Sequence, residues 1–456
     1  MCTMPGSVRR CYPVSLGVSP VLCPSVTQKT FPAKLKSRGA KTRKSRAEEQ
    51  KPENPANSRE IKGRTAMFTT NEVLPEDLII QILLWLPVVS LLRFKCVCKS
   101  WCALINGQNF INKHLLHNQT TSNKNRNAGF LLIQRQKSSN DHVFSKLQYE
   151  SLEILSTQAV PSPYFGIPKH IQINIVSSIN GLVCLNLNAG NTDIVLWNPA
   201  TNETKVLPKS GISYPQGRTL TRDVGFGFDF KTNDYKVVKL LEIFDPDSEY
   251  CINDINYFYA AEVYCLSTGS WRTVSTSAPG YFMDSGCYRT YTKGMFSWSA
   301  SIRDDLDFFP GILSFDMSNE VFLTTTLPDG DLEDPNGTWR IFFVLKELVS
   351  LVTFGKDRER LENCFYIWSL LEYGVKESWI KLFTIGPLMG IEKPLGFWKN
   401  ESLFLRNNEG QLLLYDPSAQ KITNLQVDGR PMQMITYVES LISLKRGNDL
   451  EEQGNS

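Results

Sequence analysis

The stretch "IVLWNPATNETKVLP", residues 194–208, combines a short apolar run ending near Trp197, a polar turn and a second short strand. Short apolar runs that are bounded by turn residues are typical of β-strands. The same unit recurs four more times along the chain. The further instances are "EVYCLSTGSWRTV" (262–274), "ILSFDMSNEVFLTTTLP" (312–328), "FYIWSLLEYGVKESWIKL" (365–382) and "LLLYDPSAQKITNL" (412–425).

The spacing of these units indicates a β-propeller. Their anchor residues are Trp197, Leu266, Phe315, Leu370 and Tyr415. The intervals are 69, 49, 55 and 45 residues, and apparent insertions around 209–222 and 242–257 lengthen the first. Propeller blades repeat every ~40–50 residues and bury their faces by stacking on one another. We therefore predict an all-β domain over residues 129–445, with a propeller as its architecture and a β-sandwich as the competing possibility.

A helical period precedes the β region, over residues 73–117. Pro75 suits the start of a helix, Glu76 and Asp77 complement its positive end, and Pro87 stops it. We expect three helices. Their apolar stripes include Leu78, Ile79, Ile82, Leu83 and Leu86 in the first helix, and Val97, Trp101, Leu104 and Ile105 in the third. So small a bundle cannot cover all of these side chains, which predicts a protein–protein interface.

Cysteines are concentrated in "KCVCKSWC", residues 95–102, and His114 and His117 follow. A zinc site needs four converging ligands, and Cys96-x-Cys98 lacks the usual two-residue spacing. Cys98 and Cys102 lie one helical turn apart, where thiols behave as small hydrophobic groups. We interpret the stretch as the third helix, with Val97 and Trp101 as its anchors, and predict no metal.

The chain's charge is divided unevenly. Residues 1–66 contain 14 Lys and Arg against four Glu, so that the net charge of +3 leaves −7 for the remainder. A mildly acidic body argues against nucleic-acid binding. Residues 1–66 and 446–456 lack an apolar period and are predicted to be disordered, and 118–128 to be a polar linker. The basic extension could be a targeting segment or a solvated tail ahead of a start at Met67.

The most apolar run, "LIIQILLWLPVVSLL" at 78–92, is interrupted by Gln81, Pro87 and Ser90 and is too short to span a bilayer. The 11 cysteines are scattered rather than evenly spaced, as in proteins of reducing compartments. We expect no membrane span, free thiols, and a cytoplasmic or nuclear location.

Several stretches that could suggest an enzyme are better explained otherwise. "GFGFDF" (225–230) lacks the third glycine and the following helix of a phosphate loop, so we interpret it as a strand with close backbone approach. "RDDLD" (303–307) has the character of an exposed acidic loop. Aromatic residues at 257–259 and 281–288 fall in apparent loops or blade edges and are candidate contacts for a partner. We predict no catalytic residues and no cofactor.

The helical segment closely resembles the F-box, the module by which substrate receptors dock on the Skp adaptor of cullin-RING ubiquitin ligases. The match covers two Leu-Pro pairs, Ile82-Leu83, and the series Leu92, Arg93, Phe94, Val97, Lys99 and Trp101, within a module that we place at 67–117. The resemblance implies an adaptor-facing set. Its members are Leu74, Pro75, Ile82, Leu83, Leu86, Pro87, Val97 and Trp101.

The β region resembles the kelch-like, F-box-associated domain of plant F-box proteins, and within that group S-locus F-box proteins and their relatives. The matching stretches are "SINGLVCL" (178–185), "LWNPATNETKVLP" (196–208), "VGFGFDFKTNDYKVVKL" (224–240) and "VYCLSTGSWRTV" (263–274). The resemblance implies a non-catalytic substrate receptor of a Skp-cullin-F-box ubiquitin ligase, joined through Skp to cullin and RING subunits and binding an unidentified target protein. The alternatives are an F-box protein that acts outside a ligase and a propeller enzyme.

Overall fold

The computed structural model describes residues 74–120, 128–135, 142–159, 172–188, 192–214, 218–244, 258–274, 281–283, 289–304, 307–328, 338–355, 362–430 and 432–445. All of them belong to one compact unit, Glu72–Ser456. The predicted disordered extension (1–66) and tail (446–456) lie outside the described residues. So does most of the predicted linker.

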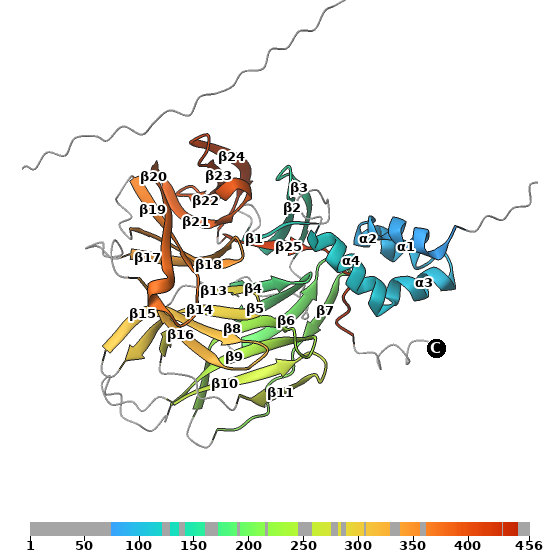
Figure 1. Cartoon of the computed structure of the whole chain (residues 1–456), viewed down its shortest axis with the longest axis horizontal. Helices are drawn as coiled ribbons and strands as arrows, with labels where there is room; N and C mark the ends of the chain where they lie inside the picture. Colours follow the sequence, from blue (N-terminus) through green and yellow to red (C-terminus); the bar gives the residue numbers. More distant parts are fainter. Residues whose placement is uncertain are drawn as a thin grey trace, which may run out of the picture. The chain divides into compact units, whose positions relative to one another are not determined.

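The β region forms six sheets of four or five strands, and the predicted propeller is confirmed (Figure 1). The competing sandwich is wrong. Blades 1 to 3 contain β25 (Met432–Val438), β1 (Ala128–Arg135), β2 (His142–Gln148) and β3 (Ile154–Ala159); β4 (Gln172–Ile179), β5 (Leu182–Asn188), β6 (Thr192–Asn198) and β7 (Glu203–Val206); and β8 (Arg218–Asp229), β9 (Asp234–Phe244), β10 (Phe258–Cys265) and β11 (Ser270–Thr273).

In the fourth blade, two short strands pair with the same neighbour, β14. Blades 4 to 6 contain β12 (Tyr281–Met283), β13 (Arg289–Thr292), β14 (Met295–Asp304), β15 (Asp307–Asp316) and β16 (Phe322–Thr326); β17 (Thr338–Leu345), β18 (Leu348–Gly355), β19 (Glu362–Leu370) and β20 (Trp379–Met389); and β21 (Ile391–Phe397), β22 (Leu403–Asn407), β23 (Gln411–Asp416) and β24 (Lys421–Asp428). Single 3-10 turns occur at η1 (Lys376–Ser378) and η2 (Lys399–Glu401).

The ring is closed by strands from the two ends of the β region. β25, the last strand, pairs with β1, the first, so blade 1 is assembled from segments about 300 residues apart in sequence. The inner strands β25, β4, β8, β13, β17 and β21 follow one another around the axis. The five predicted anchors lie on, or directly after, the third strands of blades 2 to 6. The corresponding hairpin of blade 1, formed by β2 and β3, was not among the predicted units.

Close packing between blades 3 and 4 explains "GFGFDF". Gly225 and Gly227 lie in β8, as predicted for a strand with close backbone approach. A Cβ atom at Gly225 would lie 2.6 Å from Cζ2 of Trp298, a ring that is completely buried in the neighbouring blade. Protein interiors leave no room for such an atom, so glycine is required for the two sheets to meet.

Aromatic residues that were predicted in loops or blade edges lie in strands, one of them the edge strand β12. Phe258 and Tyr259 begin β10, and residues 281–283 form β12, whereas 284–288 lie outside the described residues. "RDDLD" spans the hairpin between β14 and β15, where Asp304 is opposite Asp307. The first predicted insertion includes the beginning of β8, and most of the second lies outside the described residues.

The helical region contains four helices rather than three. They are α1 (Glu76–Leu84), α2 (Val88–Phe94), α3 (Lys99–Asn106) and α4 (Gln108–Thr120). Pro75 and Pro87 occupy the N-cap positions of α1 and α2, and Glu76 and Asp77 lie in the first turn of α1. Val97 does not belong to the third helix, because Cys98 is extended and caps it. Among the described residues, no helix is long and apolar enough to cross a membrane.

Candidate functional site

Helices α1 and α2, with the residues that flank them, display a set of large apolar side chains to solvent, as the sequence predicted. We call it the apolar face and define it by Leu74, Leu78, Ile82, Trp85, Val89 and Val97, each of which is at least half exposed. Leu78 and Ile82 lie four residues apart in α1, and Leu74 lies four residues earlier, just before the helix begins. Clustered apolar residues on a small module mark an interaction surface.

The structure separates the eight predicted adaptor-facing residues into three groups. Leu74, Pro75, Ile82 and Val97 are exposed, and Leu86, Pro87 and Trp101 are half-buried. Leu83 is only 1 % exposed and belongs to the core of the helical module, so it offers no surface to a partner in this conformation.

Two aromatic contacts join the helices of the module. The ring of Trp101 packs on Phe94, with 5.4 Å between ring centres, and so joins α2 to α3. Trp85, which is 62 % exposed, makes an edge-on contact with His117 of α4 at 4.5 Å. The predicted set did not include Trp85, although a large aromatic residue directly before a Leu-Pro pair was a visible signal for it.

His114 is a buried structural residue of α4 rather than a metal ligand. Its Nε2 lies 3.0 Å from the carbonyl oxygen of Leu86, and its Nδ1 lies 3.3 Å from the amide nitrogen of Asn118. A carbonyl only accepts and an amide NH₂ only donates, so this environment requires the neutral ring with its proton on Nε2. Burial also lowers the pKa of His114, because desolvation disfavours the charged ring.

The helical module is fastened to the propeller by the segment that follows β25, residues Glu439–Leu444, which we call the C-terminal segment. Leu441 is 4 % exposed and lies in the core formed by the helices, together with Leu83, Val88 and Ile105. Leu444 is buried in the core between blades instead. The segment therefore contributes side chains to both hydrophobic cores.

Polar contacts fix the same segment in place. Glu439 accepts a hydrogen bond from the backbone N–H of Val88 at 3.3 Å and forms an ion pair with Lys146 of β2. The side-chain amide of Asn118 donates to the carbonyl oxygen of Glu439 at 3.2 Å. Helices α2 and α4 are thus both connected to the end of the closing strand.

Asn198, in the "WNP" sequence of blade 2, binds the C-terminal segment through its side chain. Its buried side-chain nitrogen donates to the carbonyl oxygens of Ser440 and Ile442, at 3.1 and 2.8 Å. Its side-chain oxygen accepts from the backbone N–H groups of Ala200 and Thr201. All the hydrogen-bonding directions commonly used by an amide are therefore occupied, and the C-terminal segment is held against blade 2.

The cysteine-rich stretch has ordinary local contacts. Cys98 lies 3.1 Å from the hydroxyl of Ser100, and the side chain of Asn106 donates to Cys102 at 3.4 Å. Within the described part of the chain, no group of three or more His, Cys, Asp or Glu residues could hold a metal ion.

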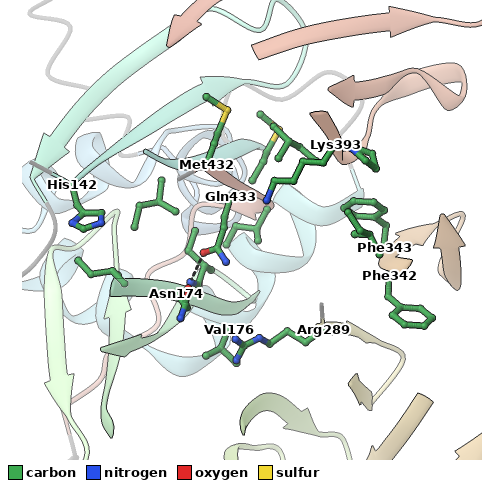
Figure 2. Close-up of a pocket in the computed structure, with 17 residues that line it drawn as sticks. His142, Asn174, Val176, Arg289, Phe342, Phe343, Lys393, Met432 and Gln433 are labelled. Carbon is green, nitrogen blue, oxygen red and sulfur yellow. Dashed lines mark hydrogen bonds between the residues drawn. The ribbon is translucent and has the colours of Figure 1, made fainter. Parts of the chain in front are cut away.

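A cavity lies at the propeller axis, with a volume of about 300 Å³ (Figure 2). Residues of the inner strands β4, β13, β17, β21 and β25 line it, together with Ile133 of β1 and His142 of β2. It lies where β4, β13 and β25 begin, whereas the C-terminal segment and α4 contact the opposite ends of β25 and β4.

Comparison with known proteins agrees with both parts of this architecture. Residues 72–113 match the F-box domain, and residues 138–444 match the F-box associated beta propeller domain. The chain belongs to the F-box proteins with an associated β-propeller. The interpretations of the helical segment as an F-box and of the β region as its associated domain are confirmed.

Relatives of this F-box protein occur in Arabidopsis thaliana. It is 25 % identical to F-box protein CPR1 over 379 residues, which cover 78 % of this chain and 85 % of the relative. It is 28 % identical to F-box/kelch-repeat protein At3g23880 over 347 residues, covering 74 % and 85 % of the two chains.

Proposed function

We propose that this F-box protein is the substrate receptor of a Skp-cullin-F-box ubiquitin ligase. The observation that carries the proposal is the apolar face of the F-box, which remains exposed although the C-terminal segment covers another part of the same module. A Skp-type adaptor would bury this face, and through the adaptor the chain would join cullin and RING subunits. The propeller would hold a target protein.

In this proposal the chain acts by position and carries out no chemistry of its own. A target held on the propeller is kept close to a conjugating enzyme on another subunit, which raises the effective concentration of its lysines. Such a mechanism requires a firm connection between the two modules. The bonds of Asn118 and Val88 to Glu439, and the burial of Leu441 among the helices, supply one.

The exposed members of the predicted set are the proposed direct contacts: Leu74, Pro75, Ile82 and Val97, with the half-buried Leu86, Pro87 and Trp101 at the edge. We extend the set to Leu78, Trp85 and Val89 because they share the exposed surface. We exclude Leu83, since replacing it would disrupt the module's core rather than an interface.

Affinity capture of the tagged full chain with a Skp-type adaptor tests the proposal. Ile82→Asp places a charge on the apolar face, where it would be desolvated on binding, and should reduce adaptor recovery at least ~10-fold. Ile422→Asp makes the same change at a half-exposed position on β24 and should leave recovery unchanged.

Undiminished adaptor recovery with Ile82→Asp would refute the proposed face. Cullin in the captured complex distinguishes a ligase receptor from an F-box protein that acts outside a ligase. Adaptor without cullin would favour the second function.

A further inference from the structure

The cavity at the propeller axis adjoins a second one, with a volume of about 150 Å³. The two share part of their lining, and the second lies further along the inner strands. β25 contributes residues 432–435 to the first cavity and 434–436 to the second, and β4, β13, β17 and β21 show the same progression. A strand rises ~13 Å from Met432 to Thr436. The two cavities are therefore successive parts of one elongated space, which we call the axial channel.

The axial channel has the size and lining of a small-molecule site. The volume of its first part, about 300 Å³, lies at the lower end of the range for ligand pockets, ~300–1,000 Å³. Apolar side chains form the larger share of the lining, and Phe342, Leu395 and Met434 line both parts. A few polar groups interrupt them, which is the pattern of sites that enclose an apolar body and orient its polar ends.

The basic side chains of the first cavity already have partners within the protein. The guanidinium group of Arg289 is held by Asp223 at 2.5 Å and by the carbonyl oxygen of Val224 at 3.3 Å. Lys393 and His142 also interact with other groups of the chain. Because these groups are engaged, we assign the recognition of a ligand to neutral side chains.

Two neutral side chains can orient a ligand, one in each part of the channel. In the first part, the side-chain oxygen of Gln433 accepts a hydrogen bond from the backbone N–H of Ile175 at 2.9 Å, so the other end of its amide is an NH₂ donor (Figure 2). Thr290 lines the second part and is only 6 % exposed, and its hydroxyl has no hydrogen-bond partner among the described residues. Buried hydroxyls are nearly always hydrogen-bonded, so an unpaired one in a channel wall is suited to a polar group of a ligand.

We propose that the axial channel binds a neutral, elongated small molecule with an apolar body and an oxygen at each end. An acceptor oxygen at one end takes the NH₂ of Gln433, and a hydroxyl at the other end pairs with the hydroxyl of Thr290. The apolar body lies against the phenylalanine, leucine and methionine side chains of the inner strands. The inference is independent of adaptor binding, because none of the residues that define the apolar face lines the channel.

Equilibrium dialysis of the full chain tests this proposal with two probes, 4-acetyl-4′-hydroxybiphenyl and 4-acetylbiphenyl. They share the apolar body and the carbonyl acceptor and differ in one terminal hydroxyl. The hydroxylated probe should bind about 5-fold more tightly, which corresponds to ~1 kcal/mol, the net worth of a neutral hydrogen bond. Thr290→Val removes the hydroxyl of the protein with little change of shape and should abolish this preference, whereas Thr290→Ser should retain it. Gln433→Leu should weaken both probes alike, because the carbonyl is common to them.

Thr423→Val is the matched control, since Thr423 is exposed on the outer strand β24 and lines neither part of the channel. It should preserve the preference for the hydroxylated probe. The proposal is overturned if neither probe binds, if the two bind the unaltered chain equally, if folded Thr290→Val still prefers the hydroxylated probe, or if folded Gln433→Leu binds both as tightly as the unaltered chain. The comparison of the two probes on the unaltered chain decides the matter even if a variant does not fold.

Discussion

Replacing Leu441 by alanine should loosen the F-box while leaving the propeller closed. The side chain is 4 % exposed and lies among the helices, far in sequence from the other fully buried members of that core. Removal of three carbon groups costs ~2.4 kcal/mol at ~0.8 kcal/mol for each group, and the cavity left behind raises the cost of buried Leu→Ala changes to ~2–5 kcal/mol. A loss of ~3 kcal/mol from the local opening of the helices increases their opening constant by about 100-fold.

Hydrogen exchange followed by mass spectrometry measures this opening directly. Peptides from α1 to α4 should exchange about 100-fold faster in Leu441→Ala, wherever exchange occurs by local opening, while peptides from β14 and β18 should keep their protection. Leu371→Ala, at a position that is 56 % exposed, is the control and should change neither region. Unchanged protection of the F-box helices in Leu441→Ala would refute the reasoning, because the C-terminal segment would then contribute nothing to their core.

Two further changes test the polar contacts around the same segment. Asn198→Ala removes an amide that makes four hydrogen bonds and leaves the carbonyl oxygens of Ser440 and Ile442 without this donor. It should therefore lower the free energy of unfolding by ~2–4 kcal/mol, measured by urea titration. A loss below ~0.5 kcal/mol would contradict the assignment. The pKa of His114 is lowered by burial, so its contribution to stability is complete above its unfolded pKa of ~6.5 and is lost as the pH falls toward the folded pKa. Urea titrations at pH 7.5 and 5.5 should therefore show a smaller pH dependence in His114→Gln than in the unaltered chain, and an equal dependence would exclude His114 as the cause.

Local sequence patterns were sufficient to identify most of the propeller. Trp197 and Phe315 lie in third strands because a blade is a local hairpin set whose apolar runs and turns are adjacent in the chain. The pairing of β25 with β1, which closes blade 1 from the other end of the β region, could not be found in this way. Periodicity detects contiguous units and gives no information on pairing across hundreds of residues.

The candidate site was predicted at the level of the module but less well at the level of the side chain. Ile82 and Leu83 are adjacent in the motif, yet one is exposed and the other buried, since neighbouring positions on a helix are about 100° apart. Leu83 lies in a core that includes Phe110 and Ile111 of α4, a helix that the prediction did not separate from the third. Val97 was expected within a helix, but the extended conformation of Cys98 places it before α3 and leaves it 62 % exposed.

The C-terminal segment has a consequence for synthesis on the ribosome. Val88 emerges 351 residues before Glu439, its hydrogen-bond partner, and the helical core lacks Leu441 until almost the whole described chain has been made. A nascent or prematurely terminated chain that ends before β25 therefore has neither a closed ring nor a complete F-box. Because the last strand and the residues after it finish both modules together, a firmly assembled F-box accompanies only a propeller that has itself been completed.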